Sequence, residues 1–368
     1  MLWGRRRARA LSWSLLAMIG TLASAEAATF VYVSNADSKD ITVLSLNRQT
    51  GDLTPIETAP VTTTGPAQSG SMPLAISPNK KFLYAALRFE PYTVVTFGID
   101  PRSGKLQQLG TAPLPDSMAY IATDRTGKHL LSASYGGHKL SVSPIGGQGT
   151  VMPNATIIPT GKNAHAVLTD PSNRYLFATN LGSDVVLQRK FDAATGAVSD
   201  NAPAAVITKP GAGPRHFVFH PNGKYFYLLN ELDASLNAYT YNGGKGTLAE
   251  LQSVSTLPAG FSGKPWAADL HITPNGKFLY GTERTSSTIA GFAVDSRSGK
   301  LTPIGSVETE KQPRGFAIDP GSRYLLAVGQ QSHAMSVYAI DPDQGTLSRI
   351  KQLPVGKNPQ WVEIVELP

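Results

Sequence analysis

Apolar residues along this chain gather in short runs and do not follow the spacing of helices. The runs are rich in Val, Ile, Phe, Tyr and Thr and are bounded by Gly, Pro, Asn and Asp, which is typical of strands joined by turns. After the N-terminal residues, no window of about 12 to 18 residues keeps the 3.6-residue apolar period of an amphipathic helix. The pattern therefore predicts an all-β protein.

One hairpin pattern recurs along the whole chain. The segment PNGKYFYLLN (221–230) resembles PNKKFLYAAL (78–87), RTGKHLLSAS (125–134), PSNRYLFATN (171–180), PNGKFLYGTE (274–283) and PGSRYLLAVG (320–329), and TFVYVSN (29–35) supplies the second half of another. The anchor residues, numbered 0 in each unit, recur every 49 residues on average; they are Phe30, Phe82, His129, Tyr175, Tyr225, Phe278 and Tyr324.

Each unit continues with a second hairpin, such as TIAGFAVDSRSGKLTPI, so that a unit holds four strands. Four-stranded repeats of about 40 to 50 residues are the blades of β-propellers. Seven units fill residues 26–368, and we expect them to form a single domain. The prediction is a seven-bladed β-propeller with four antiparallel strands per blade, whose ring is closed by the N-terminal strand near Phe30 and the C-terminal strand PQWVEIVEL (359–367).

The first 25 residues have a different character. Four arginines at 5–9 precede an apolar run at 15–22 and the segments ASA (23–25) and AEA (25–27), both of which fit the small-residue rule for cleavage, which is the layout of a cleaved export signal. We therefore expect a periplasmic or secreted protein. The alternative, an uncleaved anchor, is disfavoured because the apolar run is short for a membrane span.

Composition removes several classes of function. Loss of the four signal arginines would reduce the formal net charge from +7 to +3, and no compact basic stripe indicates a nucleic-acid partner. The absence of cysteine excludes thiol nucleophiles, disulfides and cysteine metal sites. No His or carboxylate spacing suits a metal, and no glycine loop suits a dinucleotide, so we expect no cofactor and no metal.

Two positions of the repeat carry unusual polar residues. Strand A, the innermost strand, should run from about −10 to −4, and strand B from −1 to about +6, so that positions −10 and +6 lie side by side on one face. Position −10 holds His165, Arg215 and Arg314 in three of the units. Position +6 holds Arg88, Glu231, Arg284 and Gln330 in four of them.

The repeat symmetry should gather these residues around the mouth of the central channel, where they would suit an anionic or oxyanion-forming ligand. Each has a simpler explanation by itself. An arginine could pair with a neighbouring carboxylate, Glu231 could be only the ion-pair partner of Arg215 or Arg284, and His165 could be a hydrogen-bonded channel residue. Their joint placement favours a site.

Several segments together resemble a known family. GAGPRHFVFHPNGKYFYLLNEL, WAADLHITPNGKFLYGTERT, QPRGFAIDPGSRYLLAVGQQSHAMSVYAID and VGKNPQWVEI are similar to the lactonase family of seven-bladed propellers, which includes a bacterial 6-phosphogluconolactonase and the fungal carboxy-muconate lactonising enzyme. The likeness is specific from 211 to 362 and diffuse in the first three blades. It implies site residues at His165, Arg215, Glu231 and Arg284.

The leading hypothesis is an exported sugar-lactone hydrolase that opens an aldonolactone by attack of an activated water. His165 or Glu231 would be the general base, Arg215 and Arg284 would stabilise the oxyanion, and Arg88, Arg314, His216 and Gln330 would bind substrate. We expect a small sugar lactone as the partner, no contact with membrane after signal cleavage, and a monomer. The alternatives are a non-enzymatic periplasmic propeller that binds a ligand or protein, and a muconate-type lactonising enzyme.

Overall fold

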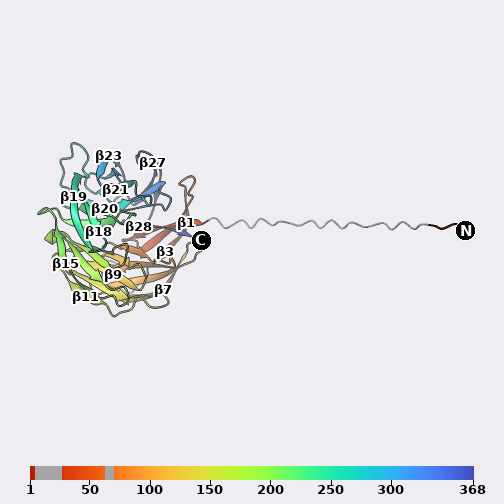
Figure 1. The fold of residues 1–368 in the computed structure, drawn as a ribbon, viewed down its shortest axis with the longest axis horizontal. Coiled ribbons are helices and arrows are strands. Elements are labelled where there is room, and N and C mark those ends of the chain that lie inside the picture. The colour runs from red at the N-terminus through yellow and green to blue at the C-terminus, as the bar shows by residue number, and fades with distance from the viewer. Residues whose placement is uncertain (5–26, 63–69) are drawn as a thin grey trace.

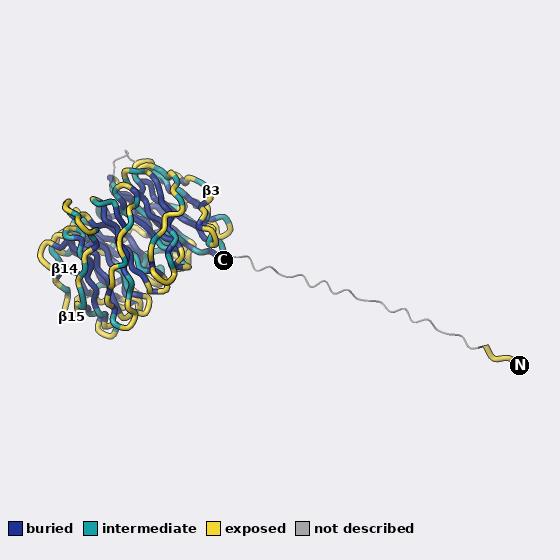
Figure 2. Tube along the Cα trace, turned by 90° about the horizontal axis from the view of Figure 1, so that it is seen from above, coloured by how far each residue is buried: buried dark blue, intermediate teal, exposed yellow. Residues whose placement is uncertain are grey.

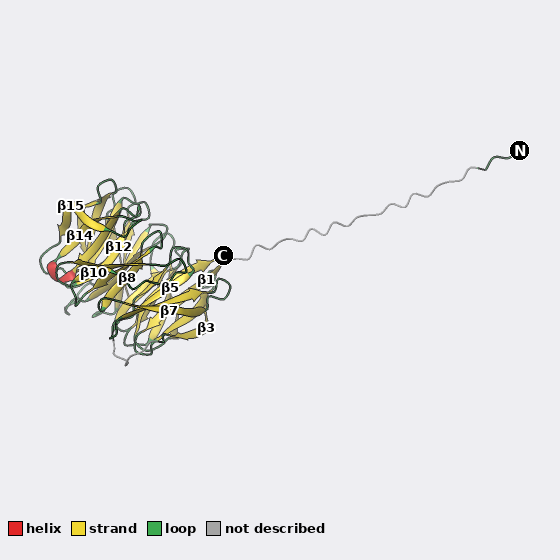
Figure 3. Cartoon of the chain, turned by 90° about the horizontal axis from the view of Figure 1, so that it is seen from below, coloured by secondary structure: helices red, strands yellow, loops and turns green. Residues whose placement is uncertain are grey.

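Seven four-stranded antiparallel sheets stand in a ring (Figure 1). The computed structural model describes residues 1–4, 27–62 and 70–368. Within them are the strands β1 to β28 and one 3-10 helix, η1 (Leu181–Ser183), which is the small helical turn in Figure 3. The predicted fold class is confirmed. The expected export signal, residues 1–25, falls almost wholly on residues outside the described ones.

Every blade is built from four successive strands, counted outwards from the ring axis. The innermost strands are β4 (Leu74–Ile76), β8 (Met118–Thr123), β12 (Ala164–Thr169), β16 (Pro214–Phe219), β20 (Ala267–Ile272), β24 (Pro313–Ile318) and β28 (Pro359–Leu367). The second strands are β5 (Phe82–Leu87), β9 (His129–Ser134), β13 (Tyr175–Asn180), β17 (Tyr225–Asn230), β21 (Phe278–Glu283), β25 (Tyr324–Gly329) and β1 (Ala28–Asn35).

The third strands are β6 (Thr93–Ile99), β10 (Lys139–Pro144), β14 (Val185–Phe191), β18 (Ser235–Asn242), β22 (Thr288–Val294), β26 (Ala334–Ile340) and β2 (Asp40–Leu46). The outermost strands are β7 (Leu106–Pro113), β11 (Thr156–Pro159), β15 (Val198–Ile207), β19 (Thr247–Ser255), β23 (Leu301–Glu308), β27 (Leu347–Pro354) and β3 (Leu53–Pro60). Burial falls from the inner to the outer strands, as the change from dark blue to yellow in Figure 2 shows.

The two ends of the propeller meet in one blade. The C-terminal strand β28 pairs with β1, and the sheet order is β28-β1-β2-β3. The predicted closure is therefore confirmed. The innermost strands contact one another in sequence around the ring, from β28 through β4 to β24 and back to β28, so they line a single central channel.

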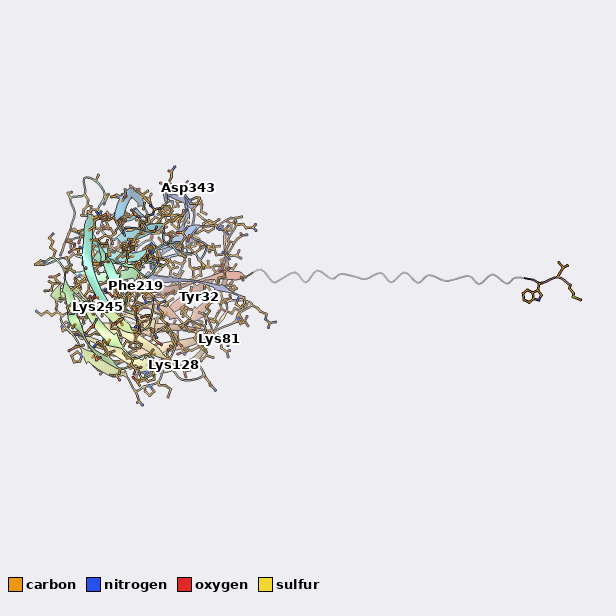
Figure 4. The ribbon with its side chains drawn as sticks, viewed as in Figure 1. Tyr32, Lys81, Lys128, Phe219, Lys245 and Asp343 are labelled. Atoms are coloured by element: carbon orange, nitrogen blue, oxygen red, sulfur yellow. The ribbon has the colours of Figure 1, made fainter. Side chains whose placement is uncertain are left out.

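The anchor residues of the repeat join one blade to the next. Each packs against a glycine in the outer turn of the following blade, at a place where an added Cβ would overlap the ring. The pairs are Tyr324–Gly51, Phe30–Gly104, Phe82–Gly149, His129–Gly196, Tyr175–Gly246, Tyr225–Gly299 and Phe278–Gly345. Several buried tyrosines two residues further on donate to the carbonyl of the same glycine, as Tyr32 does to Gly104 at 2.9 Å. In Figure 4 Tyr32 and Phe219 lie in the interior of the ring, whereas Lys245 and Asp343 lie towards its periphery.

A β-bulge recurs near the start of six innermost strands. In β16, Pro214 pairs with Asn230 and His216 pairs with Leu229, so Arg215 has no partner in the ladder. An equivalent skip leaves Ala119, Arg314 and Gln360 without a ladder partner. In β12 and β20 it spans two residues, His165 with Ala166 and Ala268 with Asp269. A bulge re-aims the side chain of the extra residue. Position −10 is therefore the bulge position, which directs its side chains to the channel mouth.

Strand boundaries differ slightly from the sequence expectation. In the fourth blade, strand A covers −11 to −6 and strand B covers 0 to +5. Position +6 is thus the first residue after strand B, where the chain leaves the ladder and the side chain is free to turn towards the axis. Among the described residues, no helix is long and apolar enough to cross a membrane.

The contact between blades predicts an effect on stability. Gly104 has φ +70°, and a side chain there would overlap the Phe30 ring. Gly104→Ala should lower the free energy of unfolding by about 2–4 kcal/mol, because a positive φ and a clash both act on the folded state. Gly147→Ala, in the corresponding turn of the next blade but with open space around it, is the control. Equal urea midpoints for the two variants would contradict the assignment.

Candidate active site

A carboxylate clamped by two arginines lies at the channel mouth. Arg215 donates from Nε to Glu231 Oε2 at 2.7 Å, and Arg284 Nη2 lies 3.0 Å from the same oxygen. Arg215 comes from a bulge, whereas Glu231 and Arg284 follow the B strands of two successive blades. Arg215 is only 1% exposed, while the Glu231 side chain keeps 13% of its surface accessible. The sequence-predicted group is thus brought together by the ring.

The guanidinium group of Arg284 is also held by backbone and by an aromatic ring. Nε and Nη2 donate to the carbonyls of Trp266 and Ala267, both at 3.0 Å. The guanidinium carbon lies 3.9 Å from the centre of the Trp266 ring, a cation–π geometry. Trp266 ends the long loop 256–266 between β19 and β20 and is itself exposed. Trp266 therefore forms part of one wall of the mouth.

Two further arginines face the same group. Arg88 donates from Nε to Ser117 Oγ at 3.0 Å and from Nη1 to Ser71 Oγ at 2.9 Å. Burial lowers the pKa of Arg314, and the nearby positive charges of Arg215, Arg284 and Arg88 lower it further, because like charges disfavour one another. Since guanidinium stays charged in proteins, the mouth holds an excess of positive charge.

Gln330 sits at the edge of this group. Its Nε2 donates to Asn358 Oδ1 at 3.2 Å, and Gln360 Nε2 donates to the same oxygen. Both glutamines are oriented by the turn before β28. Among the described residues, neither Gln330 Oε1 nor Gln360 Oε1 has a hydrogen-bond partner.

His165 is a buried, neutral imidazole beside the arginines. Its ring centre lies 5.2 Å from that of His216 and 5.9 Å from that of Tyr135. Burial, followed by the positive charge of Arg215, lowers its pKa well below 6.5. In the part of the chain that the structure describes, His165 Nδ1 has no hydrogen-bond partner. A neutral imidazole keeps a lone pair on one of its two nitrogens, and no hydrogen bond to a described residue uses it here; Nδ1 itself is buried.

Glu231 is ionised at neutral pH. Burial alone would favour the protonated acid, but the charges of Arg215 and Arg284 outweigh it and lower the carboxyl pKa below 4.5. Tyr135 has the opposite shift, because burial and the charge of Glu231 raise the pKa of its phenol. The mouth therefore presents an ionised carboxylate, a neutral imidazole and a phenol that keeps its proton.

Below the mouth, side chains at position −9 contact one another across the channel. They are Tyr120, His216, Asp269 and Trp361, which come from four different blades. The ring centres of Tyr120, His216 and Trp361 lie 5.2–5.9 Å apart, and His216 Nδ1 lies 2.7 Å from Asp269 Oδ1. This layer forms an aromatic and polar floor under the site.

A second titratable layer lies deeper in the channel at position −7. His271 Nε2 is 3.2 Å from Asp269 Oδ2, and Glu363 Oε1 accepts a hydrogen bond from Trp361 Nε1 at 2.9 Å. Burial raises the pKa of Glu363 to about 7, with the charge of Asp269 adding to the shift. No group of three or more His, Asp or Glu side chains in the described residues is arranged to hold a metal ion.

The family model described as a seven-bladed β-propeller lactonase matches residues 61–364. The chain belongs to this lactonase family. It is 40% identical over 338 residues to the 6-phosphogluconolactonase of Pectobacterium carotovorum, covering 92% of this chain and 98% of the relative. It is 41% identical over 337 residues to the 6-phosphogluconolactonase of Serratia proteamaculans, covering 91% and 98%.

A solved structure resembles this propeller closely. The periplasmic gluconolactonase of Pseudomonas aeruginosa superposes with a TM-score of 0.84 at 27% identity, covering 93% of this chain and 100% of that one. The matched family region runs from the first complete blade of this lactonase-family protein almost to its end, so it includes every residue of the mouth.

Sequence reasoning named His216 but missed Asp269, its partner in the channel of this lactonase-family protein, and Tyr135 at the mouth. Asp269 and His216 share position −9 in adjacent blades, and this equivalence was the signal that could have found their contact. Tyr135 shares position +6 with the predicted residues. His333 is exposed in the turn after β25, and its Nδ1 accepts a hydrogen bond from the backbone N–H of Asn358 at 3.0 Å. His138 Nδ1 accepts one from the backbone N–H of Asn163 in the same way.

The buried acid of the channel predicts how stability depends on pH. The folded pKa of Glu363, about 7, exceeds the ordinary value of 4.5, so ionisation opposes folding. Stability is lost as pH rises from about 4.5 to 7, and the loss is complete above this range, at roughly 1–3 kcal/mol after allowance for solvent screening. Glu363→Gln should therefore gain stability relative to the parent protein as pH rises, measured by thermal unfolding at pH 4.5 and 8.

Glu90→Gln, at an exposed position, is the matched control for this comparison. A constant difference between Glu363→Gln and the parent across the pH range would contradict the raised pKa.

Proposed function

We propose that this protein hydrolyses a sugar lactone, an aldonolactone such as gluconolactone, in the channel mouth. The observation that carries the proposal is one ionised carboxylate held by two buried guanidinium groups beside a neutral imidazole. Attack of water on a lactone carbonyl creates an oxyanion, which pre-oriented cationic donors stabilise. The names of the relatives, gluconolactonase and 6-phosphogluconolactonase, support the same substrate class.

His165 is the general base in this proposal. A neutral imidazole with an unshared lone pair can accept the proton of the attacking water, provided that it lies within about 3 Å of that water. Glu231 is the weaker choice, because its Oε2 is already shared by two guanidinium groups. Its role here is to hold Arg215 and Arg284 in place.

Arg215 and Arg284 stabilise the oxyanion of the tetrahedral intermediate. Each is fixed by three polar contacts, so little reorganisation is needed when the charge develops. The negative charge of the oxyanion also lowers the free-energy cost of protonating His165, because it offsets the positive charge of the arginines that lowers the pKa of that ring. Collapse of the intermediate then breaks the ring C–O bond, and the proton taken from water passes to the leaving oxygen.

Arg88, Arg314 and Gln330 are proposed to bind the substrate. The arginines are half-buried and carry charge that the single carboxylate Glu231 does not balance. Two other acids lie near these arginines. Asp116, however, pairs with Lys139 at 2.8 Å, and Glu283 accepts hydrogen bonds from the backbone N–H groups of Trp266 and Ser286. The surplus favours a ligand that is anionic or becomes so, and every aldonolactone opens to a carboxylate.

We further propose that the protein is exported and acts as a monomer. Residues 1–25 have the layout of an export signal, and a close structural neighbour is named as periplasmic. A closed ring leaves few free sheet edges for association. Cell fractionation and light scattering test these two points. A non-enzymatic binding role and muconate-type lactonisation are not favoured, because the relatives are named as lactonases.

The activity is tested by acid release from two substrates, glucono-δ-lactone and 6-phosphogluconolactone. The purified mature protein should open at least one of them faster than buffer, and Arg215→Ala should reduce kcat by about 10² or more, as for loss of one oxyanion donor. Arg48→Ala, which removes an arginine paired with Glu366 away from the channel, is the control. Spontaneous rates only, for both lactones, would refute the proposal.

The lowered pKa of His165 predicts the shape of the pH profile. Because the imidazole is neutral until the pH falls well below 6.5, kcat/KM, which reports the free enzyme, should stay level from pH 8 to 6 and decline only in more acidic solution. His165→Gln should remove the acid limb together with most of the rate. An inflection near pH 7 in the parent enzyme would contradict this role for His165.

A further inference from the structure

The protonation state of His216 follows from its two neighbours. Arg215 Nη1 lies 3.1 Å from His216 Nε2, and a guanidinium group only donates hydrogen bonds. Nε2 must therefore be the acceptor, and the single ring proton must be on Nδ1, which donates to Asp269 Oδ1 at 2.7 Å. Burial and the charge of Arg215 lower the pKa of this imidazole to about 4, in agreement with a neutral ring.

Asp269 is fixed by three blades at once. It lies on β20, its Oδ1 also accepts the backbone N–H of Leu270 at 2.9 Å, and its Oδ2 accepts that of Phe316, on β24, at 3.2 Å. His271 Nε2 lies 3.2 Å from Oδ2. Thr282 Oγ1 holds the backbone N–H of Asp269 itself at 3.0 Å. The carboxylate therefore cannot rotate without breaking backbone hydrogen bonds in two blades.

This arrangement uses up most of the donors of Arg215. Its Nε–H goes to Glu231, and the two N–H groups of Nη1 go to His216 Nε2 and the carbonyl of Ala268. Only Nη2 has no hydrogen-bond partner among the described residues. The direction of Nη2 is thereby set jointly by Glu231 at the mouth and by His216 and the Ala268 carbonyl, of which His216 belongs to the floor of the channel.

We propose that His216 and Asp269 are positioning residues for Arg215, in which the Asp269 carboxylate fixes the imidazole and the imidazole fixes the guanidinium group, so that Nη2 is aimed at the reacting carbonyl oxygen. The inference rests on the proposed lactone hydrolysis for its kinetic consequence, whereas the hydrogen-bond chain itself does not. Neither residue touches the substrate in this arrangement.

Two other roles for His216 give different results. As a general base it would need a free nitrogen, yet both ring nitrogens have protein partners. As a substrate ligand, the role expected from the sequence, it would contribute to binding in the ground state. The ring is 4% exposed and packed by Tyr120, Trp361 and His165, which leaves it little access to a ligand.

A matched pair of variants separates the three roles. His216→Phe keeps a ring of similar shape without an acceptor, and should lower kcat about 10- to 100-fold with little change in KM, as expected when a transition-state donor is misaligned. His216→Gln offers an acceptor to Arg215 and a donor to Asp269, and should recover most of kcat. His138→Asn, in an exposed turn, should match the parent protein.

The kinetic outcomes that overturn the proposal are distinct. Equal loss of kcat in His216→Gln and His216→Phe would identify a proton-transfer role, because glutamine cannot act as a base. A raised KM with unchanged kcat would identify a substrate ligand. Parent-like kinetics in both variants would show that Arg215 does not depend on His216.

A measurement on the unaltered protein tests the chain without reference to activity or to the folding of a variant. Ring 15N chemical shifts should show His216 neutral from pH 6 to 8, with the proton on Nδ1 and Nε2 unprotonated. A proton on Nε2, or a doubly protonated ring, would overturn the inference. If the protein opened no lactone, the proposed function would fail, and this spectrum would still decide the hydrogen-bond chain.

Discussion

The packing of each anchor side chain against a glycine of the following blade sets the geometry on which everything else depends. It is made seven times with the same partners in the same places, and the pairing of β28 with β1 makes the series circular. Successive blades consequently differ by a nearly constant rotation. A side chain at one repeat position in one blade then faces its equivalents across the axis, and residues more than a hundred positions apart meet at a single mouth.

This scaffold tolerates a costly arrangement of charge. Four guanidinium groups and one carboxylate are gathered in a place with little solvent, and burial of unbalanced charge opposes folding. The surrounding blades offset this cost with apolar cores between sheets, such as the cluster around Tyr227, Leu229 and Phe292. The mouth is therefore a region where buried charge lowers local stability, an arrangement that is common at functional sites.

The fold could be predicted because the repeat is regular and its strands carry clear turn residues. The members of the mouth could be predicted because equivalent positions must converge in a ring, and the pairing of Arg215 and Arg284 with Glu231 follows from that rule. Three features were out of reach. The bulge that removes Arg215 from the ladder depends on local backbone geometry, which the sequence does not show. The direction of the next side chain, His216, depends on the same geometry.

His216 illustrates this limit. The sequence favoured it as a substrate contact because it lies next to Arg215, whereas the bulge turns it down into the channel towards Asp269 of the next blade. The raised pKa of Glu363 was equally hidden, since a carboxyl group on a strand with alternating pattern gives no sign of being enclosed.

Residues skipped by the ladder have a wider significance. Because the bulge residue of these six inner strands has no partner in the ladder, its identity can change while the register stays intact, and the six blades show alanine, histidine, arginine, alanine, arginine and glutamine there. The bulge position is thus one where the side chain can differ between blades without disturbing the ladder. The two blades that hold alanine there, at Ala119 and Ala268, are natural places to install new chemistry.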